Sequence, residues 1–275
     1  MKVWLTTLIL VVGLLPSGTF AKSENENSIK DGMVLIPGGV YEMGNRRSLM
    51  ELNPGDVLNA DRHALGPENP AHKVYVDAFY IDIHETTNAE YLAYVKATGA
   101  REPAFTQNPD FNGPRQPVVG VSWKEAEKYC QWSGKRLPTE AEWEKASRGQ
   151  RIIEYPWGND APDSTRLNFN EEIKKTVPVK SYEAGKSDYG VYDLAGNVSE
   201  WVYDWHFPEY YIISPKKNPR GPERGKYKVI RGGNWRNHAE DVAMTYRNAT
   251  VPSLRSKTVG FRCARNTPGD GIKNN

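Results

Sequence analysis

The sequence predicts an α+β domain with little regular secondary structure, and three observations lead to this prediction. Three segments begin with the residue spacing of a capped helix. Several short runs alternate apolar and polar residues, as half-buried strands do. The 275 residues also include 8 Trp, 15 Tyr, 24 Gly and 19 Pro. Because each aromatic side chain buries a large area, this composition suits a loop-rich domain with an aromatic core.

The first 21 residues are predicted to be a signal peptide that is removed on export. Lys2 supplies a positive charge, and residues 3–15 form an apolar run. Small residues at Thr19 and Ala21 predict cleavage between Ala21 and Lys22. A membrane anchor is the alternative, but a run of about 13 residues is shorter than a bilayer-spanning helix. No cysteine follows the run as a lipoprotein anchor requires. We therefore expect a periplasmic or secreted protein with no integral membrane segment after cleavage.

Strands are predicted early in the mature chain. Residues 33–36 form an apolar run that ends in a Pro-Gly-Gly turn, the pattern of a buried strand. Residues 40–44 alternate like the returning strand of a hairpin. Residues 74–83 alternate as one further strand. Residues 46–70 have no clear period, which predicts a long surface loop.

Three helices are predicted from capping boxes, in which a Ser or Thr and a Glu three residues later satisfy free amides at a helix start. The pairs are Thr87 with Glu90, Ser122 with Glu125, and Thr139 with Glu142. The helices run toward glycines typical of helix ends, namely Gly99, Gly134 and Gly149. One face of the second helix carries Cys130, and one face of the third carries Trp143 and Ala146. These faces are predicted to meet the core.

The rest of the chain is predicted to continue the same domain. Short aromatic segments separated by Gly, Pro, Asn and Asp follow residue 149, with no repeat or interdomain linker. We expect a flexible leader over residues 22–30, one domain over residues 31–266 and a disordered tail over residues 267–275. The formal net charge is only +2 and neither sign is concentrated. The charge pattern therefore gives no support for nucleic acid or an anionic membrane as a partner.

Cys130 and Cys263 are the two cysteines of the sequence. An exported protein enters an oxidising compartment, so a disulfide between them is favoured over two free thiols. It would close a loop of more than 100 residues. Such a link constrains the unfolded chain by about 4–5 kcal/mol in the chain-entropy model. The pairing would also leave no thiol free for chemistry.

Seven sequence blocks along the mature chain form a recognisable pattern. They are Met33–Gly39, Glu85–Asn88, Pro117–Trp123, Gly134–Glu144, Gly190–Trp201, Arg231–Trp235 and Gly260–Cys263. In this order they resemble the formylglycine-generating-enzyme family, also called the sulfatase-modifying-factor domain. The resemblance implies the formylglycine-generating-enzyme fold, a C-type-lectin-like variant with low regular secondary structure and a shallow surface cleft. It also implies a disulfide between Cys130 and Cys263, because family members commonly join these two positions.

The sulfatase-activating members of this family bind copper through two cysteines shortly after the Arg-Gly-Gly block. With oxygen, they convert a cysteine of a client sulfatase to formylglycine. Thiolates are the ligands that monovalent copper prefers, so the residue type is a chemical requirement. The corresponding residues here, 234–247, contain no cysteine. The resemblance therefore implies a protein that does not use the cysteine–copper mechanism.

The same segment supplies the candidate residues of the cleft, whose catalytic roles are unknown. These candidates are Asn234, Trp235, Asn237, His238, Tyr246 and Arg247. The alternative for two of them is structural, with Trp235 in the core and Arg247 bonded to backbone carbonyls.

Two other branches of the family bear on the chemistry. One holds iron through a His-x-x-x-His-x-Glu cluster and makes sulfoxides. No two of the five histidines here have that spacing; they are His63, His72, His84, His206 and His238. Separate histidines can still converge on iron in a fold. Another branch is exported, lacks the copper cysteines and includes a protein required for oxidative maturation of the siderophore pyoverdine. This chain resembles that branch most in organisation, and whether it binds a redox metal stays open.

Calcium is the cofactor that the resemblance implies. The family holds one ion in the loop written here as residues 193–200, where oxygen ligands of the kind calcium prefers are present. They are the carboxylates of Asp193 and Glu200 and the carbonyls of Gly196 and Val198. A solvated turn is the alternative. A second family site would use Asn168 and the carbonyl of Phe169, with a carboxylate further along a loop that is short here.

Two functions remain. The first is a factor that assists oxidative maturation or modification of an exported small molecule or protein. The second is a noncatalytic, calcium-stabilised module that binds a peptide, a glycan or a partner protein. Family membership favours the first and the missing cysteines favour the second, and we prefer the first. The sequence names neither the client nor the oligomeric state.

Overall fold

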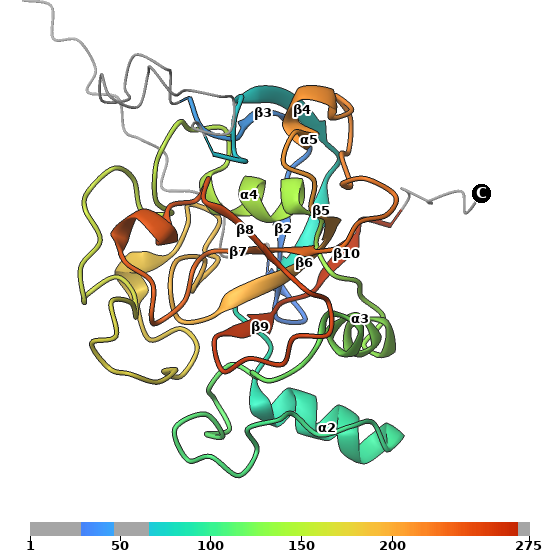
Figure 1. The fold of residues 1–275 in the computed structure, drawn as a ribbon, viewed down its shortest axis with the longest axis vertical. Helices are drawn as coiled ribbons and strands as arrows, with labels where there is room; N and C mark the ends of the chain where they lie inside the picture. Colours follow the sequence, from blue (N-terminus) through green and yellow to red (C-terminus); the bar gives the residue numbers. More distant parts are fainter. Residues whose placement is uncertain (1–28, 47–65, 269–275) are drawn as a thin grey trace, which may run out of the picture.

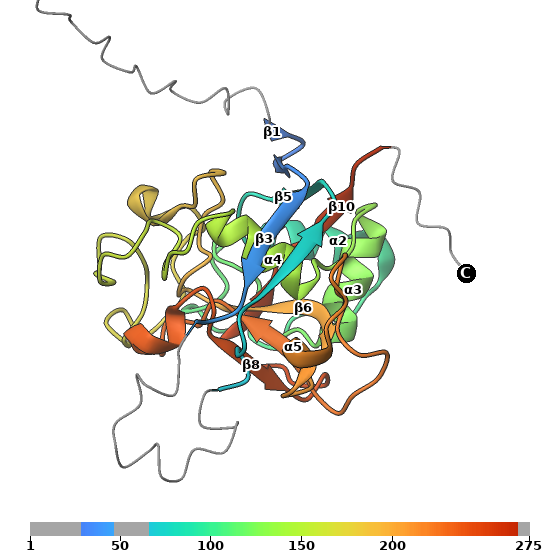
Figure 2. The ribbon, with the colours of Figure 1, turned by 90° about the horizontal axis from the view of Figure 1, so that it is seen from above.

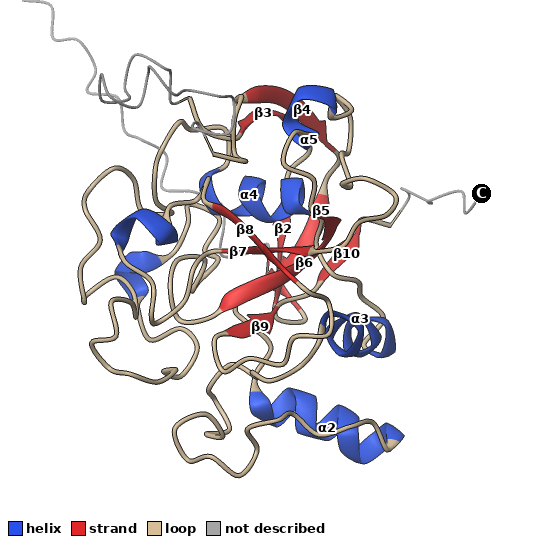
Figure 3. Cartoon of the chain, in the orientation of Figure 1, coloured by secondary structure: helices blue, strands red, loops and turns tan. Residues whose placement is uncertain are grey.

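The computed structural model describes residues 29–46 and 66–268, and loops make up most of this part (Figure 3). The predicted signal peptide, most of the leader, most of the loop after residue 46 and most of the tail lie outside the described residues. Strand β1 (Ile29–Lys30) pairs with β2 (Met33–Ile36), so regular structure begins two residues before the expected boundary at residue 31. Within the described ranges, no helix combines the length and apolar character that crossing a membrane needs.

The described strands form three small sheets. The first has the order β1-β2-β5-β10, with β5 at Phe79–Asp82 and β10 at Ala264–Asn266. The second pairs β3 (Gly39–Met43) with β4 (His72–Val76). The third has the order β8-β7-β6-β9. Its strands are β6 (Ser199–Trp205), β7 (Lys228–Arg231), β8 (Arg247–Thr250) and β9 (Val259–Phe261).

Two strand predictions are wrong in the same way. Residues 33–36 and 40–44 do not form a hairpin, and residues 74–83 are not one strand, because β2 pairs with β5 while β3 pairs with β4. The physical reason lies in the register, which runs on from Ile36 opposite Phe79 to Gly39 opposite Val76. The Pro-Gly-Gly segment is therefore a bend between β2 and β3. The paired segment between β4 and β5 bends at the same place, so both segments pass from one sheet to another there.

The three predicted helices are confirmed. They are α2 (Asn88–Thr98), α3 (Trp123–Trp132) and α4 (Glu140–Arg148), and each has both hydrogen bonds of its capping box. Gly99 and Gly149 end α2 and α4, whereas Gly134 follows the cap residue Ser133 of α3. Shorter helical turns are η4 (Glu183–Gly185), α5 (Tyr210–Ile213) and η5 (Ala239–Val242).

Helix α4 occupies the centre of the molecule. It lies between the β3-β4 pair and the third sheet, and it contacts β3, β4, β6 and β7 (Figures 1 and 2). Trp143 and Ala146 are fully buried in the main core, as predicted. The charged residues of α4 are buried as well, including Glu140, Glu144 and Arg148. A helix with this charge content in the interior needs internal partners for its charges.

A second core cluster joins α2 and α3 to β9. Tyr91 stacks on Tyr129 with ring centroids 5.5 Å apart, and Phe261 meets Tyr129 edge-on at 5.4 Å. The predicted disulfide is confirmed: Cys130 of α3 is joined to Cys263 after β9, with Cα atoms 5.7 Å apart. Both cysteines are fully buried, so neither thiol is available for chemistry.

Candidate functional site

The segment after β7 turns sharply at two glycines. Gly232 and Gly233 have φ angles of +88° and +66°, a region that favours glycine. A Cβ atom on Gly233 would lie 2.6 Å from the carbonyl oxygen of Asp241, so the chain passes very close to itself. The turn places residues 234–238 against residues 168–171. Backbone hydrogen bonds of 2.8 Å, one of them from Asn170 to the carbonyl of Asn237, join the two segments.

Asn234, Asn237 and Asp241 form a chain of hydrogen bonds in the segment after Arg-Gly-Gly, which the resemblance matches to the copper-binding stretch. The Asn234 backbone N–H donates to Asn237 Oδ1, and Asn237 Nδ2 donates to Asp241 Oδ2, both at 3.0 Å. Asn234 Nδ2 donates to Ser199 Oγ at 3.1 Å. The segment therefore presents amide and carboxylate groups. It lacks the two soft thiolates that monovalent copper prefers as ligands.

His238 lies on the surface beside this chain. Its Nδ1 is 2.7 Å from Asn170 Oδ1, and its side chain is exposed. No three His, Cys, Asp or Glu side chains in the parts of the chain that the structure describes gather into a group that could hold a metal.

Two of the predicted cleft residues are buried. Trp235 packs against Phe111 and Val198, and its Nε1 donates to the carbonyl of Lys257 at 3.2 Å. The Nε of Arg247 is 2.8 and 3.0 Å from the two carboxylate oxygens of Glu140. Trp235 therefore lies in a core cluster, as the alternative interpretation expected. Arg247 Nη1 donates to one backbone carbonyl, that of Phe207 at 3.0 Å, but its Nε is paired with a carboxylate, which that interpretation did not include.

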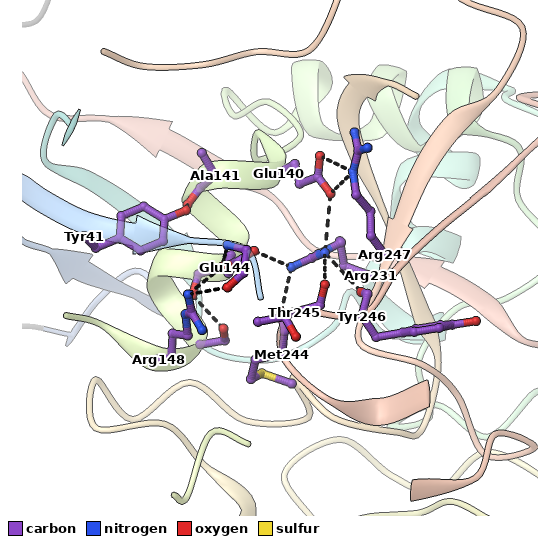
Figure 4. A network of polar contacts seen from close by, with 12 residues as sticks. Tyr41, Glu140, Ala141, Glu144, Arg148, Arg231, Met244, Thr245, Tyr246 and Arg247 are labelled. Carbon is purple, nitrogen blue, oxygen red and sulfur yellow. Dashed lines mark hydrogen bonds and ion pairs between the residues drawn. The ribbon is translucent and has the colours of Figure 1, made fainter. Parts of the chain in front are cut away.

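Arg247 is one end of a buried ionic network on α4 (Figure 4). Arg231 lies at its centre, where its Nη2 donates to Glu144 Oε2 at 2.7 Å and to the Met244 carbonyl at 2.6 Å. Arg148 lies at the opposite end, 3.1 Å from Glu144. The arginines and glutamates thus alternate, which compensates charges that would otherwise be costly to bury.

Two cavities flank the ends of this network. The first has about 540 Å³ and lies between the end of β3, the end of α4, residues 152–159 and η5. Tyr246 lines it, together with Glu240, Glu154 and Arg148, which the sequence analysis did not single out. The second has about 310 Å³, and Arg247 and His206 line it. The remaining four predicted residues line neither cavity.

The predicted candidates therefore do not share one cleft. The structure brings residues 234–238 together, whereas the neighbouring Tyr246 and Arg247 belong to two different cavities. No sequence motif marks Arg148, Glu154 or Glu240. Their proximity depends on how the loops after α4 and β7 pack, which sequence spacing does not reveal.

The predicted calcium loop contains a buried excess of negative charge. Glu200 accepts from Arg262 at 2.6 and 2.7 Å and from Trp143 Nε1 at 2.9 Å. Asp193 accepts from the backbone of Lys180 at 2.8 Å, and burial raises the pKa of Asp193 to about 6. Glu85, which we did not predict, lies beside them, and burial raises its pKa well above the usual range. Three buried carboxylates therefore lie near one buried guanidinium, but each already accepts hydrogen bonds, and they do not gather into a group that could hold a metal in the described structure.

The second predicted calcium position contains one unsatisfied oxygen atom. Asn168 Oδ1 is buried and has no hydrogen-bond partner within the described residues. Such oxygens suit a hard cation. The carbonyl of Phe169, by contrast, already accepts from Glu172 at 3.2 Å. The side chain of Asn168 therefore suits the predicted role of calcium ligand better than the carbonyl of Phe169 does.

The fold and this set of residues define a class of protein: a mixed helix and sheet domain of C-type-lectin-like type, with two buried cysteines joined and a thiol-free segment after Arg-Gly-Gly. Residues 18–267 match the model of the sulfatase-modifying factor enzyme 1-like domain. The chain therefore belongs to the formylglycine-generating-enzyme family, as its sequence blocks predict.

Three individual comparisons illustrate this membership. The chain is 32% identical to the formylglycine-generating enzyme of Streptomyces coelicolor, over 85% of this chain and 88% of that protein. It is 36% identical to the serine/threonine-protein kinase pkn1 of Chlamydia caviae, over 77% of this chain. The chain spans only 37% of that kinase. Among solved structures, PvdO from Pseudomonas aeruginosa is similar with a TM-score of 0.69 and 28% identity, over 86% of this chain and 94% of PvdO.

Proposed function

We propose that this protein is an exported factor that assists oxidative maturation or modification of a periplasmic small molecule or protein, without the cysteine–copper mechanism. The observation that carries the proposal is the hydrogen-bonded Asn237–Asp241 pair, which lies where the copper-binding members have thiolates. The likeness to PvdO over nearly its whole length supports the exported, pyoverdine-maturation branch of the family. The chain's own cysteines are joined to each other, which excludes them as a copper pair.

The surface around His238 supplies the groups for such a role. His238 is exposed and oriented by Asn170, so its imidazole is open to a client or a metal ion from solvent. Asn237 and Asp241 next to it can orient a polar client. Calcium would be held by Asp193, Glu200 and the carbonyls of Gly196 and Val198, and its charge would stabilise the loop that precedes β6.

The metal content of the protein purified from a periplasm tests the proposal. Elemental mass spectrometry is expected to find copper or iron near one equivalent in the wild type. His238→Ala should lose this metal. His238→Gln, which keeps a hydrogen-bonding side chain opposite Asn170 but removes the imidazole, should lose it as well. Metal retained in both variants would remove His238 from the proposed site.

A noncatalytic binding module is the second candidate, and two observations favour it. Trp235 and Arg247 are buried structural residues, and the charges of the buried carboxylates Glu85, Asp193 and Glu200 influence one another. Such a module predicts calcium as the bound metal and a client that is bound unchanged. Calcium without copper or iron in the purified protein would favour this candidate.

A further inference from the structure

Four large apolar side chains are exposed at and around the short helix α5. Ile212 and Ile213 lie on the helix itself and are 50% and 67% exposed. Phe207 is exposed just before the helix, and its carbonyl accepts from the backbone of the first helical residue at 3.1 Å. Tyr227 is exposed beside Phe207, because its carbonyl accepts from the backbone of His206 at 2.8 Å. These four residues, the α5 patch, form an apolar surface of the kind that marks binding sites.

Helix α5 lies at the outer surface of the molecule. Figure 1 shows it beside β4 at the top, and Figure 2, viewed from above, shows it on the near side. Its first two residues, Tyr210 and Tyr211, are buried in the main core and hold the helix in place. The other two residues, Ile212 and Ile213, point to solvent. The helix is therefore anchored by its tyrosines and presents its isoleucines outward.

Basic side chains accompany the α5 patch. Five of them, all exposed, lie between the end of α5 and Tyr227; they are Lys216, Lys217, Arg220, Arg224 and Lys226. Residues 207–227 contain two acidic residues, Glu209 and Glu223, so the formal net charge of this stretch is +3. The whole chain has a formal net charge of only +2. The positive charge of a nearly neutral protein is therefore concentrated beside its α5 patch.

Backbone hydrogen bonds fix the basic stretch beside α5. The carbonyl of Lys216 accepts from the backbone of Tyr75 in β4 at 2.7 Å, and the Asn218 N–H donates to the Tyr75 carbonyl at 2.8 Å. The Nζ of Lys217 lies 5.5 Å from the centroid of the Tyr75 ring and 3.6 Å from Asp77, and its side chain is 68% exposed. The stretch thus has a defined position, and its cations remain open to solvent.

An apolar surface with cations beside it matches the surface of an anionic lipid bilayer. Isoleucine and phenylalanine side chains enter the boundary between headgroups and acyl chains, whereas tyrosine stays at the level of the headgroups. Lysine and arginine side chains are attracted to the negative charge of the lipids. A partner recognised by charge alone would account for the five cations but not for the exposed Ile212 and Ile213. The combination therefore favours a lipid surface over an acidic protein.

We propose that the α5 patch and the basic residues of the 216–227 stretch attach this protein reversibly to an anionic membrane surface. Ile212 and Ile213 insert among the headgroups, and the five cations lie at the lipid phosphates. The inference does not depend on the oxidative role, because attachment requires neither a metal nor a client. It adds a location to the account: the protein works at a membrane surface.

Co-sedimentation with lipid vesicles tests this proposal. The protein purified from a periplasm is mixed with vesicles of phosphatidylglycerol and phosphatidylcholine, or with vesicles of phosphatidylcholine alone. We expect binding to the anionic vesicles that weakens as NaCl is added, and little binding to the neutral vesicles. No binding to the anionic vesicles, or equal binding to both kinds, would overturn the proposal.

Apolar variants show whether the patch inserts. The double variant Ile212→Ser with Ile213→Ser is expected to weaken binding to the anionic vesicles about tenfold, because the inserted apolar area is lost. Ile173→Ser, at an exposed isoleucine outside the patch, is the control and should leave binding unchanged. All three positions are exposed, so the variants should fold. Unchanged binding in the double variant would overturn the proposal.

Charge variants show whether the position of the cations matters. Lys216→Gln with Lys217→Gln is expected to weaken binding about tenfold or more. Lys174→Gln with Lys175→Gln removes the same charge at exposed lysines elsewhere and should have a much smaller effect. Equal effects of the two pairs would mean that net charge alone attracts the protein, which would overturn the proposal.

Two further measurements identify a protein partner in place of a membrane. An acidic protein partner predicts tight binding to polyglutamate that the Ile212→Ser and Ile213→Ser double variant retains. A second copy of this chain predicts self-association, measured by light scattering, that the double variant loses. Either result without vesicle binding would overturn the proposal. Because these assays measure neither metal nor oxygen, their failure is separate from failure of the maturation role.

Discussion

The carboxylate of Glu144 is shared by three donors in the interior. It accepts from the Gly44 backbone at 2.8 Å, from Arg231 at 2.7 Å and from Arg148 at 3.1 Å. Arg231 and Glu144 are both fully buried. Removing one member of such a pair leaves an uncompensated charge away from water, which costs far more than a surface pair contributes.

Glu144→Gln is therefore expected to lower the free energy of unfolding by about 3–5 kcal/mol, because Arg231 and Arg148 would lose their shared counter-charge. Urea unfolding followed by fluorescence measures the change. Glu183→Gln is the matched control, since the exposed pair of Glu183 with Lys186 should contribute about 1 kcal/mol or less. Equal effects of the two substitutions would show that the interior network does not stabilise the fold.

His206 makes stability depend on pH. Burial, followed by the nearby charge of Arg247, lowers the pKa of His206 to about 4 in the folded protein, against an ordinary value near 6.5. The unfolded chain therefore takes up a proton first as the pH falls. The stabilising contribution is complete above pH 6.5 and is lost as the pH falls from 6.5 toward 4.

Comparing the wild type with His206→Gln isolates this contribution, because carboxylates titrate in both proteins. The difference in urea midpoint between them should change between pH 6.5 and pH 4.5 and stay constant from pH 6.5 to 7.5. An NMR titration of the His206 ring gives the pKa directly. A midpoint near 6.5 for that ring would refute the expected shift.

The identity of single residues was the least reliable basis for predicting which residues line a cleft. Trp235 and Arg247 were candidates for the cleft because they lie in the segment after Arg-Gly-Gly, yet both are buried in structural contacts. The charged residues of α4 would predict a helix on the surface, because a helix rich in acidic and basic residues is normally exposed. The sequence therefore did not indicate that α4 is buried. Whether a charged residue is inside depends on partners far away in the sequence, such as Glu144 and Arg231.

Helices were more predictable than strands at the scale of elements. A capping box is a local signal, because its two hydrogen bonds join residues three apart, and all three predicted boxes are present. Strand pairing is not local. The alternation of residues 74–83 correctly indicated extended structure, but it could not show that residues 77–78 pass between two sheets.

Calcium binding at the loop of residues 193–200 would make the melting temperature depend on calcium. If calcium binds there, chelation with EDTA should lower the melting temperature by about 5–10 °C at a calcium concentration near 100 times the dissociation constant. Differential scanning calorimetry with and without calcium measures the shift. Asp193→Asn should abolish the response to calcium. A melting temperature that is the same with EDTA and with calcium would argue for a solvated turn.

The family and its fold were predictable for the whole molecule, because seven motif blocks occur in order and the fold depends on them jointly. The cysteine pairing was predictable as well, since the two cysteines suit an oxidising compartment and the family joins these positions. The cavity beside η5 was not predictable, because Arg148, Glu154 and Glu240 come from segments that meet only after folding. The sequence predicts the positions of residues that local hydrogen bonds or family motifs fix. It does not predict the positions of residues that depend on loop packing.

Oxygen uptake tests the central claim most directly, namely that the protein acts oxidatively without thiols. The purified protein is mixed with periplasmic extract of the organism that makes it, before and after treatment with iodoacetamide under native conditions. We expect uptake that depends on the protein, that iodoacetamide treatment of the protein leaves unchanged because Cys130 and Cys263 are joined, and that His238→Ala abolishes. Uptake lost after alkylation of the protein, or no uptake at all, would contradict the account.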